Sequence, residues 1–68
     1  MTRRPKTLDE VDWEAASDAF VKSARNMTLA EVREQAELAA AQLEADGNPE
    51  GAEVYRRVAA VLSRRLAH

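Results

Sequence analysis

A helix stop signal followed at once by a helix start signal, at Asp46-Gly47-Asn48-Pro49, constrains the fold of this chain more than any other feature. Gly47 can adopt the left-handed conformation that closes a helix at its C′ position. Asn48 is a favoured N-cap, and Pro49 then occupies the first helical position, where its missing N–H is not needed. Helix-compatible residues fill both flanks, so the sequence predicts an antiparallel helical hairpin.

The first arm of this hairpin, expected at residues 29–46, carries a heptad pattern. Thr28 and Glu31 form a capping box that starts the helix. Apolar residues then recur at steps of three and four, the spacing of a helix that packs on one neighbour. We predict that this line forms the seam of the hairpin or of a dimer: Leu29, Val32, Ala36, Ala39 and Leu43.

The returning arm, expected at residues 49–67, is the most amphipathic segment. Its valines and leucines fall within one half-turn, and Val58 and Leu62 complete the predicted seam. Arg56, Arg57 and Arg64 fall on the polar side of the helix. We therefore expect this helix to supply most of the core and to present an arginine face.

A further helix is predicted at residues 8–25, where Thr7 and Glu10 match a capping box. This helix has two apolar stripes, one with Leu8 and Val11 and one with Trp13 and Phe20. Two stripes require two neighbours to pack against. These are either the hairpin and a second copy of the chain, or the hairpin and a foreign partner anchored by the two aromatic residues.

The apolar content is too small for a large core. Of the 68 residues, 14 are alanine, whose burial contributes little to the free energy of folding. The chain has no cysteine that would permit a disulfide, and small domains without staples are marginal. The sequence therefore predicts an all-α protein of three helices that dimerises into a helical bundle.

Charge is distributed unevenly along the chain. Residues 1–6 are basic and contain a proline, so we expect a disordered arm there and a single helical domain over residues 7–68. Residues 7–46 are acidic, and the last segment is basic again. No apolar run is long enough for a membrane span or a secretory signal, so we expect a cytoplasmic protein.

The sequence offers no recognisable catalytic arrangement. His68 is the only histidine, the two glycines flank a helix start, and the many carboxylates lie on polar helix faces without a histidine beside them. We therefore expect no enzymatic activity, no metal and no cofactor.

Protein binding is the predicted function. Trp13, Phe20 and Leu38 are the expected apolar contacts, and Arg56, Arg57 and Arg64 are the charged alternative. A second hypothesis is nucleic-acid binding by the basic arm and these arginines, although the acidic helices would repel a duplex. A third is a purely structural oligomerisation module.

The turn and the return helix also resemble a known type of hairpin. The segment at 43–52, followed by an aromatic and an Arg-Val-Ala run at 55–59, is similar to small uncharacterised bacterial and prophage proteins. The resemblance covers about a third of the chain and rests on generic capping and core residues. It implies a phage-type accessory protein that binds and inhibits a host regulator or enzyme, by analogy of size and class.

Overall fold

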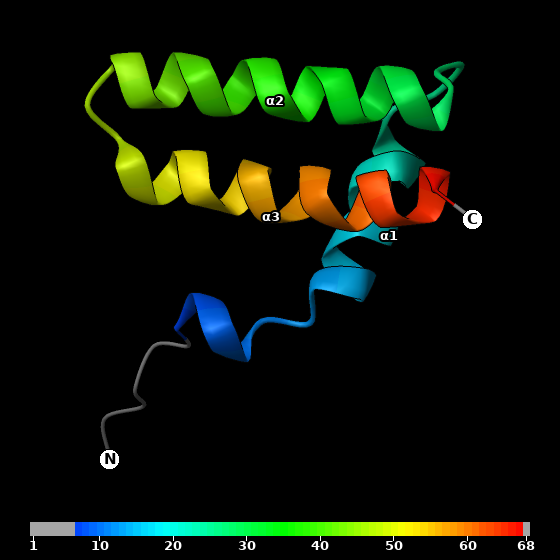
Figure 1. Ribbon diagram of the computed structural model, residues 1–68, viewed down its shortest axis with the longest axis horizontal. Coiled ribbons are helices and arrows are strands. Elements are labelled where there is room, and N and C mark those ends of the chain that lie inside the picture. Colours follow the sequence, from blue (N-terminus) through cyan, green and yellow to red (C-terminus); the bar gives the residue numbers. More distant parts are fainter. Residues whose placement is uncertain (1–6, 68) are drawn as a thin grey trace.

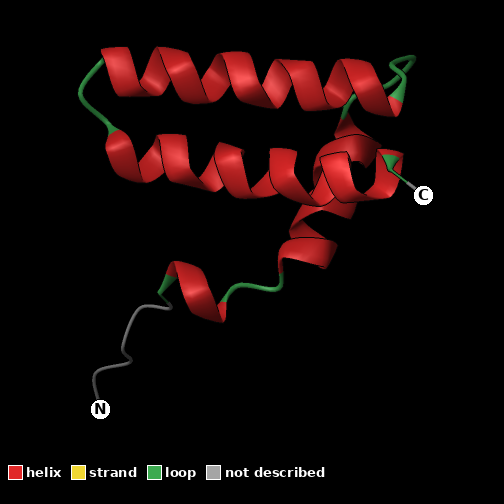
Figure 2. Ribbon diagram, in the orientation of Figure 1, coloured by secondary structure: helices red, strands yellow, loops and turns green. Residues whose placement is uncertain are grey.

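The computed structural model describes residues 7–67, and within this range every regular element is a helix (Figures 1 and 2). A short 3₁₀ turn, η1 (Leu8–Glu10), is followed by three α-helices: α1 (Trp13–Ser23), α2 (Leu29–Ala45) and α3 (Pro49–Leu66). The predicted all-α fold of three helices is confirmed for this range. The basic arm predicted at residues 1–6 lies outside the described residues, and dimerisation stays a prediction.

Helices α2 and α3 form the predicted antiparallel hairpin and lie side by side in Figure 1. Gly47 has φ +81°, the left-handed conformation. The Asn48 N–H donates to the Leu43 carbonyl at 2.8 Å and the Gly47 N–H to the Glu44 carbonyl at 3.1 Å, which is the Schellman pattern. On the other side of the turn, the Asn48 side chain accepts from the Gly51 N–H at 3.0 Å. The stop and start signals therefore act as predicted.

The start of α2 is also as predicted. The Thr28 hydroxyl accepts from the Glu31 N–H at 3.2 Å, and the Glu31 carboxylate accepts from the Thr28 N–H at 2.9 Å. The capping box is thus complete. Helices α2 and α3 each end one residue earlier than the sequence pattern suggested, a difference typical of helix termini.

The helix predicted at residues 8–25 is wrong at its start. Thr7 makes no capping hydrogen bond through its side chain, and η1 gives way to extended backbone at Val11 and Asp12. Helix α1 begins only at Trp13, where the Asp12 carboxylate accepts from the Ala15 N–H at 3.1 Å. Aspartate at position 12 is itself a strong N-cap. This second helix start follows so soon that the helical turn beginning at Leu8 does not continue into α1.

Helix α1 also ends earlier than predicted, at Ser23. Ala24 caps it, and Asn26 then takes the left-handed conformation with φ +63°. Because Leu8 and Val11 lie outside α1, the apolar stripe that was expected to join them to α1 does not exist as one helical face.

The core is small and lies mainly along the hairpin. Its centre consists of five buried side chains, Val32, Ala36, Val58, Ala59 and Leu62. Of the remaining predicted seam residues, Leu29, Ala39 and Leu43 are half-buried at its edges. Ala40, next to Ala39 on α2, is 2% exposed. The small side chains let the two helix backbones approach closely.

Helix α1 crosses the hairpin and makes its main contacts with α3 rather than α2 (Figure 1). Half-buried residues of α1, among them Trp13, Phe20 and Val21, pack against the core from this side. No helix within residues 7–67 is long and apolar enough to cross a membrane.

Candidate protein-interaction surface

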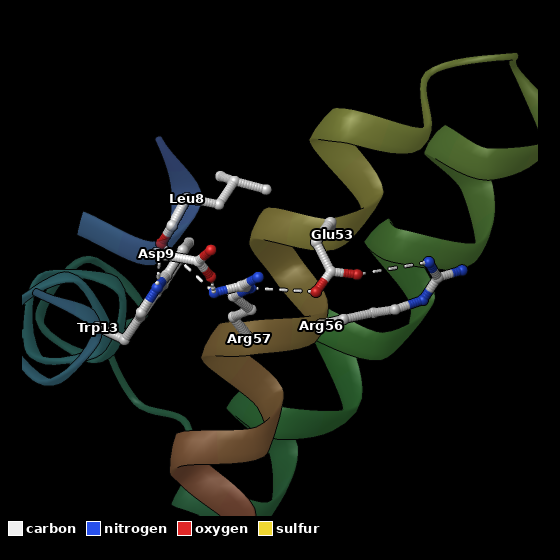
Figure 3. Close-up of polar contacts among 6 residues, drawn as sticks. All are labelled: Leu8, Asp9, Trp13, Glu53, Arg56 and Arg57. Carbon is white, nitrogen blue, oxygen red and sulfur yellow. Dashed lines mark hydrogen bonds and ion pairs between the residues drawn. The ribbon is translucent and has the colours of Figure 1, made fainter. Parts of the chain in front are cut away.

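Trp13, predicted as a partner anchor, is engaged inside the chain. Its indole N–H donates to the Leu8 carbonyl at 2.8 Å, which closes η1 against the start of α1 (Figure 3). The Arg57 guanidinium lies 5.6 Å from the centre of the indole ring, within the range of a cation–π contact. Trp13 is therefore half-buried, and its one polar group is satisfied without a partner.

Arg57 joins α3 to the N-terminal segment. Its Nη1 lies 3.0 Å from the Asp9 carboxylate and donates to the Leu8 carbonyl at 3.4 Å, while its Nε donates to Glu53 at 3.1 Å (Figure 3). The hydrogen bonds to Asp9 and then Glu53 raise the pKa of Arg57 above its ordinary value. Its charge is thus committed to the fold.

Phe20, the second predicted aromatic anchor, packs on the chain's own hairpin. Its ring meets Tyr55 of α3 edge to face, with 5.7 Å between the ring centres and 72° between the planes. This is a favoured geometry for an aromatic pair. The aromatic stripe of α1 therefore covers α3 in this structure.

The other arginines of α3 are ion-paired as well. Arg56 pairs with Glu44 of α2 and lies 4.0 Å from Glu53. Arg64 lies 3.9 Å from Glu14 of α1. The spacing of Glu53 and Arg57 is visible in the sequence as an i, i+4 pair, but the pairs between helices are not.

Arg65 makes contacts between helices that the sequence analysis did not single out. Its Nη1 lies 2.8 Å from the Asp18 carboxylate, and its Nη2 donates to the Glu14 carbonyl at 3.3 Å. Arg57 and Arg65, two turns apart on α3, therefore hold the two ends of the α1 contact. The only signal for this arrangement in the sequence was the complementary charge of the acidic segment at residues 7–26 and the basic segment at residues 47–68.

Leu38 is the predicted contact residue that remains free. It is 59% exposed and lies about half a helical turn from buried Ala36, on the side of α2 that faces away from α3. We define the α2 outer face as five exposed residues on this side, Ala30, Glu34, Leu38, Ala41 and Ala45. Leu66, which the sequence pattern placed in the core, is 40% exposed at the end of α3.

An open depression of about 590 Å³ lies beside α1, lined by Ala15, Asp18, Ala19, Val21 and Lys22. All of its lining residues come from one helix, and Asp18 is already paired with Arg65. Among residues 7–67, no three histidine, cysteine or carboxylate side chains gather as a metal site would require.

The chain was also compared with known proteins. No protein-family model, curated protein or solved structure matches it. The fold places the chain in the class of all-α proteins with a helical hairpin and a crossing third helix. Its function has to be inferred from the surface of the chain itself.

Proposed function

We propose that this chain is a non-enzymatic module that binds another protein through the α2 outer face. The observation that carries the proposal is the exposure of Leu38 at the middle of that face. Burying a leucine side chain stabilises a complex by about 1.5–3 kcal/mol. Leu38, Ala41 and Ala45 have the i, i+3, i+7 spacing used in helix-in-groove recognition, and the alanines admit a closely packed partner.

Contacts within the chain favour a smaller set of partner contacts than the sequence predicts. Trp13, Phe20 and Arg57 already have partners within the chain, so they are unsuited to be primary contacts. Arg56 and Arg64 remain on the surface, and exposed ion pairs such as theirs contribute little to stability. Both arginines are therefore available to exchange a carboxylate of this chain for one on a partner.

The proposal extends to what binding achieves. A module of this size has little volume for a water-excluding catalytic pocket, and its effect on a partner is therefore by occupancy of the partner's surface. Inhibition of a host regulator by a phage-encoded protein in the cytoplasm is the specific form that the hairpin resemblance implies.

The test is a pull-down with the tagged chain from nuclease-treated lysate of its native host, with bound proteins identified by mass spectrometry. Leu38→Glu is compared with Leu66→Glu, which alters another exposed leucine on a different helix. We expect one stoichiometric partner that the wild type and the Leu66 variant retain and the Leu38 variant loses. Circular dichroism of both variants checks that the fold is intact.

Two outcomes would contradict the proposal. Equal loss with both leucine variants would show that the α2 outer face is not the contact. Recovery of nucleic acid when nuclease is omitted, abolished by Arg56→Gln with Arg64→Gln, would favour the nucleic-acid hypothesis instead. Arg57 is left unchanged in this comparison because it holds η1 in place.

A further inference from the structure

We propose that this chain forms a dimer by exchanging α1, so that the α1 of each copy docks on the α3 of the other. The proposal concerns self-association. It goes beyond the binding of another protein, and it does not involve the α2 outer face.

The first support is that the surface on which α1 packs belongs to α3. We call this surface, which includes Tyr55, Arg57 and Arg65, the seat of α1. Arg57 holds Asp9, Arg65 holds Asp18, and Phe20 meets Tyr55. Each of these contacts joins the N-terminal segment to α3, and α1 makes its main contacts there rather than with α2. None of them requires that α1 and α3 belong to the same copy. An α1 from a second copy would therefore make the same contacts.

Charge complementarity identifies the occupant. The seat presents Arg57 and Arg65, and the segment that fills it is acidic, with five acids and two basic residues over positions 7–26. A second copy carries the same acidic helix with the same Phe20. Residues 27–46, which include α2, hold five acids against Arg33, so the acidic helix has no comparable seat on α2.

The connection between α1 and α2 is suited to act as a hinge. Residues 24–28 link the two helices, and Asn26 within them has φ +63°. A non-glycine residue in this conformation is mildly strained, less so for asparagine than for most residues, and the strain is relieved if the hinge extends. Five extended residues span up to about 17 Å. The capping box of Thr28 and Glu31 keeps the start of α2 intact while the hinge opens.

Exchange also suits the small core. The exchanged dimer keeps the hairpin contacts and the α1–α3 contacts of the closed chain, and only the hinge residues Ala24 and Met27, which pack against the core, have to be rearranged. Exchange of an identical element is a low-cost route to a dimer, favoured by a strained short hinge. Because association costs translational entropy, the dimer is expected to increase with protein concentration.

A pair of engineered cysteines distinguishes the two states. The natural chain has no cysteine, so a short bismaleimide cross-linker joins only the introduced sites. In the Asp18→Cys/Arg65→Cys variant it joins α1 to the α3 on which that helix is seated. The closed chain then gives a cross-linked monomer, and the exchanged form gives a covalent dimer in a denaturing gel.

The matched control is the Glu44→Cys/Arg56→Cys variant, whose two sites are ion-paired across the hairpin of one copy. It gives a cross-linked monomer in either state. After unfolding and refolding at millimolar concentration, we expect a covalent dimer from the first variant and a monomer from the control. A monomer from both, at micromolar and millimolar concentration alike, would overturn the proposal.

A second measurement does not depend on cross-linking. One variant carries Arg57→Glu with Arg65→Glu, and the other carries Asp9→Arg with Asp18→Arg. Each variant seats its own α1 less well, because like charges then face each other, but exchange between the two variants restores the opposite charges at both seats. We expect a 1:1 heterodimer of twice the monomer mass by light scattering on mixing. Two separate monomers would contradict exchange.

These outcomes are independent of those for the proposed function. Absence of exchange leaves capture of a partner through Leu38 untouched. Conversely, an exchanged dimer that captures no other protein supports this inference while the binding proposal fails.

Discussion

The α2–α3 hairpin and the junction between the N-terminal segment and α3 are held together by different physics. The hairpin depends on buried aliphatic side chains and on caps formed by residues close in sequence, such as Thr28 with Glu31. The junction depends on arginines and aromatic edges, and its contacts are remote along the chain. Arg57, for example, lies 49 positions from Leu8, whose carbonyl it contacts.

The difference indicates which part of the molecule is the more robust. Burial of apolar surface does not depend on charge, whereas exposed ion pairs are screened by salt and contribute at most about 1 kcal/mol each. Side chains at the hairpin centre, such as Leu62, are fully buried, while Asp9 and Asp18 in the junction are exposed. We therefore expect the hairpin to be the stable unit and α1 to be the part that detaches.

The largest expected effect comes from Leu62→Ala. Leu62 is 0% exposed at the centre of the hairpin, and truncation of a buried leucine costs about 2–5 kcal/mol. This is a large fraction of the stability of about 3–10 kcal/mol expected for a domain of this size. Urea unfolding followed by far-UV circular dichroism measures the loss. Leu38→Ala is the control, because Leu38 is 59% exposed and should change stability by no more than about 0.5 kcal/mol. Similar losses for the two variants would contradict the hairpin core.

Phe20→Ala tests the junction and should cost less, about 2 kcal/mol, from the half-buried ring and its edge-to-face contact with Tyr55. Trp13 is the only tryptophan, so its fluorescence reports α1 separately from the circular dichroism of all helices. We expect the variant to shift the fluorescence transition to lower urea than the helical transition. Lys22→Ala, which alters an exposed residue of α1, should leave the two transitions together. Coincident transitions in the Phe20 variant would show that the junction and hairpin unfold as one unit.

The same contrast explains what the sequence could and could not predict. The turn at Gly47 and the capping box at Thr28 were predicted because each signal is complete within a few residues. The start of α1 was not, because Thr7 and Asp12 both offer caps and the choice between them involves Arg57, far along the chain. A sequence pattern cannot compare such alternatives.

The candidate site shows the same limit. Periodicity correctly separated Trp13 and Phe20 from the other apolar residues of the first helix, but it cannot tell which neighbour covers a stripe. The structure shows that α3 covers it, through Tyr55 and Arg57. Leu38 was easier to interpret, because its position on α2 is opposite the seam that the heptad pattern defines.

Gly47→Ala is expected to cost about 1 kcal/mol, since an alanine resists the left-handed conformation. A Cβ at this position would meet nothing within 4 Å, so the cost is conformational and not steric. Gly47→Asn is the matched control, because asparagine tolerates φ near +81° better than alanine does. The free energy of unfolding should fall less for asparagine. Equal losses would indicate that the turn does not require the left-handed conformation in solution.

The smallest expected effect is the pH dependence contributed by Glu31. The N–H of Thr28, and then its hydroxyl, lower the pKa of the Glu31 carboxyl below its ordinary value. A carboxyl with a lowered folded-state pKa stabilises the fold above its unfolded-state pKa, and this contribution is lost as the pH falls through the folded-state pKa. Glutamine also completes a capping box, so Glu31→Gln removes the titration but keeps the hydrogen bond.

Urea midpoints of the wild type and Glu31→Gln should therefore differ by a constant amount near neutral pH and converge in acid, where the glutamate is protonated. Because the capping box belongs to α2, the difference should appear in the helical transition of the hairpin. A difference that persisted unchanged in acid would show that charge at Glu31 is not the cause. A difference confined to the Trp13 fluorescence would assign the effect to the junction, contrary to the division between the two regions.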